Sequence, residues 1–249
     1  MKRHARITLL LFFGLWIGSP EGWAQTTESG FVPLLNGSSL EGWEGDPTYW
    51  RIENGTLVGE VTPTTLLKTN TFLIWQQQQP ADFELKGIFR ITKDGNSGIN
   101  YRSERVPEVP YALKGYQADI DGQNKYTGQN YEERGRTTLA YRGQQTRIQP
   151  FTQGNVRELV KNNAWTMLTV EKSLGEAEAL QSRIKTEDWN EFHLIVKGNR
   201  LQHFINGVLM SDVTDLDTVN GKKAGLLGVQ VHVGPPMKVE YRNLRLKTL

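Results

Sequence analysis

Apolar and polar residues alternate with a period of two along most of the chain from about residue 30 onward. In the segment Asp82–Thr92, every second residue from Phe83 to Ile91 is apolar or glycine, and Trp189–Val196 and Gly225–Val233 follow the same pattern. Successive side chains on a β-strand point to opposite faces of the sheet. The pattern therefore predicts antiparallel strands that each have one buried face and one more polar face.

Turn signals separate the expected strands. Asn-Gly pairs favour the two-residue hairpin turn in which both central residues have positive φ. One such pair, Asn54-Gly55, separates the run Trp50–Ile52 from Thr56–Val61. Another, Asn206-Gly207, lies between Leu201–Ile205 and Val208–Asp212 and predicts a meander.

These elements predict an all-β fold, a single antiparallel β-sandwich of the jelly-roll type with a short helical insertion. The insertion is expected at Lys172–Lys185, which is rich in Ala and Glu. The runs Gly225–Val233 and Lys238–Leu246 are expected to form the last strand pair.

The stretch from Asn96 to Glu133 holds the residues most suited to binding a ligand. Two of its expected strands, Gly98–Arg102 and Gly115–Asp121, each carry a polar face, and Gly225–Val233 repeats the design. Amide, guanidinium and carboxylate groups can be oriented to bind hydroxyl-rich ligands. We therefore expect these faces to line one hollow on the concave side of a sheet, with the polar residues Asn100, Arg102, Gln117, Asp119, Gln230 and His232 and with Tyr101 beside them.

The N-terminal segment has the composition of a signal peptide. Three basic residues precede the apolar run Ile7–Ile17, and small residues lead to a plausible cleavage site after Ala24. We expect residues 1–24 to be removed on export to the periplasm or outside the cell, without stable membrane insertion, and residues 25–249 to form one domain. Basic and acidic residues are equal in number in that remainder, so no basic stripe indicates a nucleic-acid partner.

Several kinds of site are excluded or disfavoured. The chain has no cysteine, which excludes disulfides and thiolate zinc sites. Its four histidines lack the spacing of a zinc site, and no metal or other cofactor is predicted, although Asp and Asn oxygens would also suit Ca²⁺. A retaining glycosidase needs two carboxylates about 5–5.5 Å apart, and the laminarinase pattern Glu-x-Asp-x-Glu is absent.

An ordered set of motifs carries a family resemblance. It comprises LLNGSSLEGW, WRIENGTLVG, DFELKGIFRI, GNSGINYR, GYQADI, YEERGR, DWNEFHLIVKGNRLQHFINGVLMSD, GLLGVQVHVG and VEYRNLRLKTL. The set, spread from about Gly30 to Leu249, resembles the 3-keto-disaccharide hydrolase domain family. The resemblance implies a concanavalin A/laminarinase-like jelly roll. It also implies action on glycosides whose sugar carries a ketone at C3, made by a partner oxidoreductase.

On such a substrate, the ketone acidifies the hydrogen at C2, and removal of that proton leads to expulsion of the group at C1. The site then needs a base, a stabiliser for the enolate and an acid for the leaving group. The candidate catalytic residues are His232 or Asp119 as the base, Arg102 as the enolate stabiliser, and Glu132 or Glu133 as the acid. The candidate substrate-binding residues are Asn100, Gln117, Gln230, Lys114 and Tyr101.

Two other classes of function remain open at this level. A non-catalytic carbohydrate-binding module can share the same fold, since fold does not fix function. An interaction domain of a larger surface assembly is the third class, and the sequence attaches no second domain that would favour it.

Overall fold

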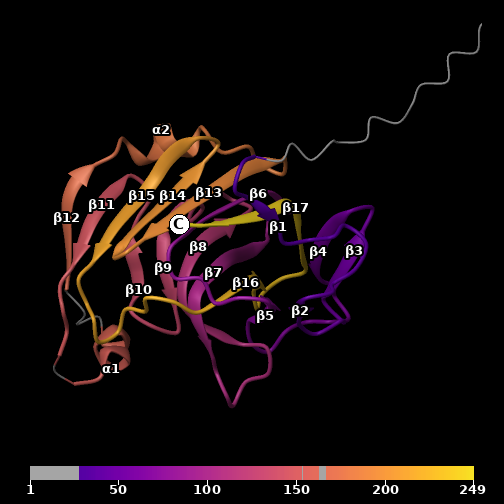
Figure 1. The fold of residues 1–249 in the computed structure, drawn as a ribbon, viewed down its shortest axis with the longest axis horizontal. Coiled ribbons are helices and arrows are strands. Elements are labelled where there is room, and N and C mark those ends of the chain that lie inside the picture. Colours follow the sequence, from indigo (N-terminus) through magenta and orange to yellow (C-terminus); the bar gives the residue numbers. More distant parts are fainter. Residues whose placement is uncertain (1–27, 153, 163–166) are drawn as a thin grey trace, which may run out of the picture.

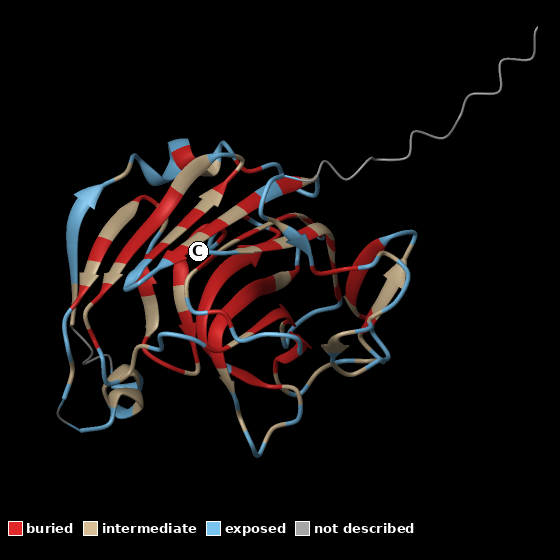
Figure 2. Ribbon diagram, in the orientation of Figure 1, coloured by how far each residue is buried: buried red, intermediate tan, exposed pale blue. Residues whose placement is uncertain are grey.

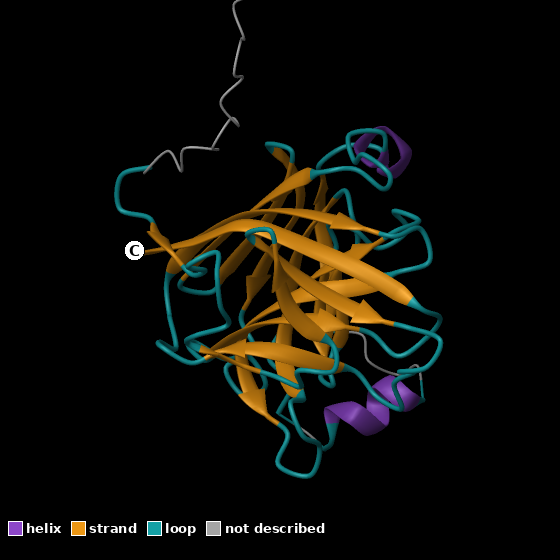
Figure 3. Cartoon of the chain, turned by 90° about the vertical axis from the view of Figure 1, so that its right-hand side faces the viewer, coloured by secondary structure: helices purple, strands orange, loops and turns teal. Residues whose placement is uncertain are grey.

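Two β-sheets packed face to face make up the structure, a computed structural model that describes residues 28–152, 154–162 and 167–249 (Figure 1). The predicted signal peptide lies outside these residues. Figure 3 shows the strands in two layers with the short helices at the periphery. No helix in the described part of the chain is long and apolar enough to span a membrane.

The larger sheet has ten strands within the described residues and is antiparallel except where β11 runs parallel to β15. Its order is β12 (Leu168–Ser173), β11 (Gln144–Ile148), β15 (Val208–Asp215), β14 (Arg200–Ile205), β13 (Asn190–Lys197), β6 (Phe83–Ile91), β17 (Met237–Thr248), β4 (Thr56–Val61) and β3 (Trp50–Glu53), with β1 (Val32–Pro33) paired to β17.

The smaller sheet has seven strands and contains the polar runs identified from the sequence. Its order is β10 (Thr137–Ala140), β9 (Asn130–Glu133), β8 (Leu113–Asp121), β7 (Asn96–Arg105), β16 (Leu226–Val231), β5 (Thr71–Trp75) and β2 (Trp43–Glu44). The two helices described are α1 (Val156–Lys161) and α2 (Ala177–Gln181). The all-β sandwich class is confirmed.

The predicted hairpins form as expected. Asn54 and Gly55 have φ of 48° and 75°, and Asn206 and Gly207 have φ of 49° and 75°. Both central residues are thus left-handed, which matches the right-handed twist of the flanking strands. Strand β6 also alternates strictly between buried and partly exposed residues, and Figure 2 shows that most buried residues lie on the strands of the two sheets.

The structure corrects two expectations about elements. The segment Lys172–Lys185 is helical only over Ala177–Gln181, because its first residues continue β12 and pair with β11. Strands β16 and β17 do not pair with each other: β16 pairs with β5 and β7, and β17 pairs with β4 and β6. Each is inserted in a different sheet, so the chain crosses the sandwich between them.

A polar network lies inside the hydrophobic core. The Tyr101 hydroxyl lies 2.8 Å from Nε2 of His203, and the Asn130 amide donates to the same hydroxyl at 3.1 Å. His203 is 1% exposed, and burial lowers its pKa to about 4, although the Gln129 carbonyl near its Nδ1 opposes this. The imidazole is therefore neutral in the folded protein.

This burial predicts a loss of stability in acid. The unfolded chain takes up a proton on His203 below about pH 6.5, whereas the folded chain resists it down to about pH 4. Stability contributed by the neutral ring is therefore lost as the pH falls through this window, by up to about 3 kcal/mol. This loss of stability is measured by comparing the urea unfolding midpoints of the wild type and His203→Gln at pH 7.5 and at pH 4.5. The wild type should lose more stability than the variant, and equal losses would contradict the prediction.

A second buried polar group links the two sheets. Arg136, fully buried, pairs with Glu132 at 2.8 Å, Asp215 at 2.7 Å and Asp217 at 3.3 Å. We call these four residues the Arg136 cluster. Burial alone would lower the pKa of Arg136, but hydrogen bonds and charges from Glu132 and Asp215 raise it overall. The guanidinium therefore stays charged.

Candidate functional site

The polar runs of the smaller sheet form a single strip on its outer face. Strands β7, β8 and β16 are neighbours, and the register places Asn100 opposite both Gln117 and Gly228. Residues two apart share a face, so Gln230 and Asp119 continue the strip along β16 and β8. The prediction that the three strands line one surface is confirmed, and the apolar residues between them face the core.

The smaller sheet curls over this strip. Three strands separate β5 from β9, which would place them about 19 Å apart in a flat sheet. Yet Asn70, immediately before β5, donates from Nδ2 to Oε1 of Glu133 at the end of β9 at 3.3 Å. The two sides of the sheet therefore meet across the concave face, and we call the polar residues enclosed between them the pit.

Burial increases toward the bottom of the pit. Asn100 and Gln230 are 0% exposed and form its floor with Gln117. Asp119 and Glu133, at 8% and 9%, form the walls with Asn70. Tyr131, Asn96 and His232 are partly exposed and lie at the rim.

A chain of amide groups ends on the Asp119 carboxylate. Gln230 donates from Nε2 to Oε1 of Gln117 at 3.2 Å, and Gln117 donates to Oδ1 of Asp119 at 2.6 Å. Gln129 donates to the second carboxylate oxygen. A glycine makes room for this chain, because a Cβ at Gly98 would approach Gln117 to 2.5 Å.

Two amide side chains on the floor have polar atoms without hydrogen-bond partners. Both side-chain polar atoms of Asn100, and Oε1 of Gln230, are buried without a hydrogen bond. An amide flip cannot satisfy Asn100, since neither end has a partner. Buried polar atoms are normally paired, so unpaired ones converging in one pit point to a bound ligand or water. The free groups comprise a donor and acceptors, which suits sugar hydroxyl or carbonyl groups.

Burial raises the pKa of both carboxyl groups in the walls. It raises the pKa of Asp119 to about 7, against the hydrogen bonds from Gln129 and Gln117, and the Glu133 charge adds to the rise. Burial also raises the pKa of Glu133, with Arg134, the Asn70 hydrogen bond and His232 opposing it. Raised values of this kind suit groups that exchange protons near neutral pH.

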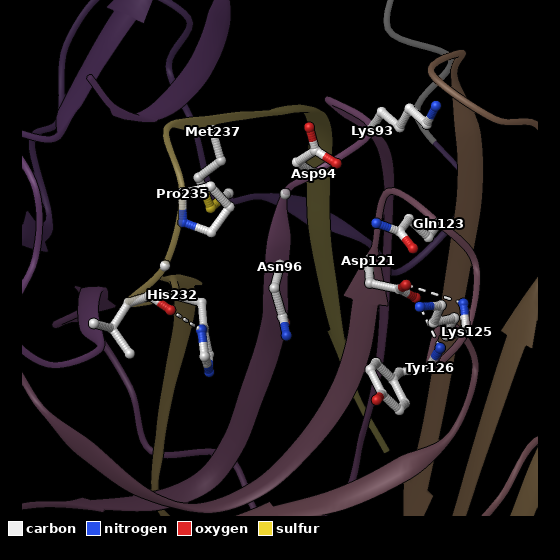
Figure 4. Close-up of a pocket in the computed structure, with 13 residues that line it drawn as sticks. Lys93, Asp94, Asn96, Asp121, Gln123, Lys125, Tyr126, His232, Pro235 and Met237 are labelled. Carbon is white, nitrogen blue, oxygen red and sulfur yellow. Dashed lines mark hydrogen bonds between the residues drawn. The ribbon is translucent and has the colours of Figure 1, made fainter. Parts of the chain in front are cut away.

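His232 follows β16 and borders a pocket of about 330 Å³ at the rim. Figure 4 shows Asn96 of β7 between His232 on one side and Asp121 of β8 on the other. The His232 Nδ1 lies 2.5 Å from the Val233 carbonyl oxygen, which can only accept, so Nδ1 carries a hydrogen. Asp121 instead accepts the backbone N–H groups of residues 125–127 and holds that loop.

Arg102 does not lie in the pit. The β7–β8 register shifts between Tyr101 and Glu104, and Arg102 adopts a φ of 44°, which turns its side chain away from Asn100. At 2% exposed, it donates to the Ala81 and Gly198 carbonyls and to Asp82. Arg102 also lies six residues along β7 from Asn96, whose carbonyl accepts the His232 N–H. Arg102 is therefore about 20 Å from His232. The expectation that Arg102 shares the polar face was wrong.

Three other candidates also lie elsewhere. Tyr101 packs in the core, and Glu132 faces the interior in the Arg136 cluster. Lys114 is exposed and pairs with Glu104 at 3.3 Å. The candidates that the fold brings together are Asn100, Gln117, Asp119, Glu133, Gln230 and His232.

Three residues of the pit were not among those predicted from the sequence: Asn70, Gln129 and Tyr131. Gln129 and Tyr131 precede Glu133 at spacings of four and two, so alternation along β9 could have revealed them. No local signal marks Asn70, which reaches the pit only through the curl of the sheet. For Ca²⁺, no group of three or more His, Cys, Asp or Glu side chains among the described residues could hold a metal ion.

Comparisons with solved structures agree on the fold. A candidate glycosyl hydrolase from Parabacteroides distasonis aligns at 19% identity and a TM-score of 0.57, covering 88% of this chain and 94% of that one. The carbohydrate-binding module CBM66 from Bacillus subtilis aligns at 13% identity and 0.51, covering 83% and 96%. A protein of unknown function with a galectin-like fold from Bacillus subtilis aligns at 10% and 0.52, covering 84% and 90%. No curated protein matches this chain.

The sandwich fold is shared with these solved structures, and the family model that matches the chain describes a carbohydrate-active class of domain. Within that class, the chain belongs to the 3-keto-alpha-glucoside-1,2-lyase-like domain family, whose profile matches residues 30–247. The jelly-roll fold implied by the sequence resemblance is thereby confirmed.

Proposed function

We propose that this protein cleaves glycosides whose sugar carries a ketone at C3, by removing the proton at C2 and eliminating the group at C1. The observation that carries the proposal is Asp119, a buried carboxylate whose pKa is raised to about 7 at the wall of an amide-lined pit. Family membership supports the choice of substrate. A separate oxidoreductase would supply the ketone.

The reaction needs one proton removed and one delivered. A base takes the C2 proton, and the electron pair moves toward the C3 oxygen as an enolate. The C3 carbonyl then re-forms while the C1–O bond breaks, leaving a C1–C2 double bond, and an acid protonates the departing oxygen. Water adding across that double bond, with OH at C1 and H at C2, completes hydrolysis.

Asp119 is the base in this proposal. A general base works best when its pKa lies near the working pH, and Asp119 meets this condition. The amide groups of Gln117 and Gln129 hold both carboxylate oxygens and fix their direction. His232 borders the rim pocket, and in the neutral ring its Nε2 is free to assist the proton transfers.

Glu133 is the acid for the leaving group. Its pKa is raised by burial, which keeps a larger fraction protonated, and its charge and that of Asp119 influence each other. Proton-transfer enzymes commonly use a pair of carboxyl groups, one of which accepts a proton while the other donates one. Asn70, bonded to Glu133, positions it at the wall.

Asn100 takes the role first given to Arg102. Its unpaired Nδ2 is a buried donor that can receive the enolate oxygen, and such donors act strongly where water is excluded. Replacing Asn100 with Ala is expected to lower kcat by about 10²–10³-fold. Steady-state kinetics measures the loss, with Asn36→Ala in an exposed turn as the control. A decrease confined to KM would remove Asn100 from the enolate-binding role.

The proposal is tested with matched substrates. Purified protein is incubated with a 4-nitrophenyl 3-keto-glucoside and with the unoxidised glucoside, and nitrophenol release is followed. Release from only the oxidised compound supports elimination. Exchange of the C2 hydrogen with solvent deuterium, followed by NMR, separates proton abstraction from direct displacement at C1. Equal release from both compounds, or from neither, would rule the proposal out.

A non-catalytic carbohydrate-binding role is the second candidate. CBM66, a binding module by its name, aligns over most of both chains. Saturable binding of the ketone-bearing glucoside without turnover would favour this role.

A further inference from the structure

A strongly basic pocket lies beside Glu133, and the proposed reaction leaves its charge unexplained. It has a volume of about 370 Å³ and is bordered by the end of β9, the start of β8, the loop that leads into α1, and the loop at residues 219–222. Four cationic side chains line it, and we call it the basic pocket: Lys114, Arg134, Arg157 and Lys222.

The basic pocket adjoins the pit. Glu132 and Arg134, the chain neighbours of Glu133, both line the basic pocket. Lys114, which also lines it, directly precedes Gly115, the residue that pairs with Glu133 across the strands. The charge of Arg157 reaches into the pit, because it lowers the pKa of both Glu133 and Tyr131 against the effect of burial. A molecule seated at Glu133 would therefore reach the cations of the basic pocket.

The cations are only partly neutralised. Lys114 and Lys222 share one carboxylate, Glu104, at 3.3 and 2.9 Å. Glu132 faces Arg136 and does not neutralise the pocket.

The two arginines keep capacity to bind an anion. Arg157 donates to the Gly135 carbonyl at 3.1 Å and is in no ion pair with any described residue. Arg134 donates to Thr69 and lies 3.8 Å from Glu133, while its Nε is buried without an acceptor. Guanidinium groups with free N–H donors bind carboxylates and phosphates through paired hydrogen bonds.

We infer that the basic pocket binds an anionic group on the leaving-group side of the glycoside, so that the preferred substrates carry a carboxylate or a phosphate-like group there. This inference rests on the proposed function, since it places the leaving group beside Glu133. Lys114, predicted from the sequence as a binding residue of the pit, would contribute charge here instead.

The test compares substrates that differ in charge alone. The 3-keto-glucosides of 4-hydroxybenzoate and of its neutral amide, 4-hydroxybenzamide, have nearly the same shape, and a 4-phosphonophenyl compound distinguishes phosphate-like anions from carboxylates. We expect kcat/KM for at least one anion to exceed that for the amide by about tenfold or more at low salt. The ratio should fall as ionic strength rises, because the pocket is partly open to water.

Variants show which residue causes the preference for anionic leaving groups. Arg157→Gln should bring the anion-to-amide ratio close to one, and Arg157→Lys should keep part of it. Lys197→Gln, an exposed residue at the end of β13 in the other sheet, should leave the ratio at the wild-type value. Because each ratio compares two substrates on one protein, a partial folding defect cancels. A wild-type ratio near one, or one that Arg157→Gln leaves unchanged, would overturn the inference.

Binding of the unoxidised glucosides separates the two proposals. Titration calorimetry with 4-carboxyphenyl, 4-phosphonophenyl and 4-carbamoylphenyl glucoside needs no turnover. If the ketone-bearing compounds are not cleaved but at least one anion binds about tenfold more tightly than the amide in an Arg157-dependent way, the proposed reaction fails and the basic pocket stands. If cleavage proceeds equally with all three, the basic pocket fails and the reaction stands.

Discussion

Replacing Asp119 with asparagine is expected to reduce kcat on a 3-keto-glucoside by about 10²–10⁴-fold, because the variant cannot accept the C2 proton. The side chain keeps its shape, and its amide can still hydrogen-bond to Gln117 and Gln129 after they reorient. In the wild type, kcat/KM should rise about tenfold per pH unit up to about pH 7, since only the ionised Asp119 carboxylate can act as the base. Stopped-time assays from pH 5 to 9 measure both effects.

The same substitution should make the protein more stable. The unfolded chain loses the Asp119 proton near pH 3.8, whereas the folded chain holds it to about pH 7. Wild-type stability therefore falls as the pH rises through this window, and the full cost remains above it. Asparagine carries no such cost, so Asp119→Asn should gain up to about 4 kcal/mol at pH 8 and nothing near pH 3.5.

If Asp119→Asn lowers activity but raises stability, the carboxylate is catalytic, whereas loss of both would indicate a structural carboxylate. Asp188→Asn, at an exposed turn, should change neither. If Asp119→Asn instead lowers the urea midpoint at pH 8, the carboxylate supports the fold, and its role as the base is withdrawn.

Replacing Arg136 with leucine is expected to destabilise the protein by about 3–5 kcal/mol. The substitution leaves the carboxylates of Glu132, Asp215 and Asp217 buried without their cation. The Tyr116 hydroxyl, which donates to Asp215 at 2.6 Å, cannot replace the lost charge. Urea or thermal unfolding monitored by tryptophan fluorescence measures the change.

An exposed ion pair provides the comparison for this prediction. Arg51 pairs with Glu53 and Glu60 at the surface, and such pairs contribute at most about 1 kcal/mol. Arg51→Ala should therefore be nearly neutral. Equal effects of Arg136→Leu and Arg51→Ala would mean that the Arg136 cluster is hydrated and contributes little.

Local pattern was enough to predict most strands and turns. Alternation fixed which residues of β6 face the core, since the pleat sends every second side chain to the same side. The Asn54-Gly55 and Asn206-Gly207 turns were predictable because positive φ at two successive positions favours those residues. The expected helix in Lys172–Lys185 is present but shorter than the segment, because Lys172 and Ser173 pair with β11 instead.

The pit was predictable only in part. Period-two spacing placed Asn100, Gln117, Asp119 and Gln230 on polar faces, and the structure brings those faces together. The same rule failed at Arg102, because an extra residue on β7 near Tyr101 shifts the register and reverses the side that follows.

Local sequence was enough to identify a β-sandwich of a carbohydrate-active family and the residue types on its polar strand faces, because side-chain direction along a strand depends only on local geometry. Tertiary structure alone decided that Asn70 meets Glu133, that Arg136 collects three carboxylates, and that Asp119 is buried deeply enough to raise its pKa to about 7. These features depend on how far the sheet curls and which distant segments it brings together, and no short stretch of sequence encodes that curvature.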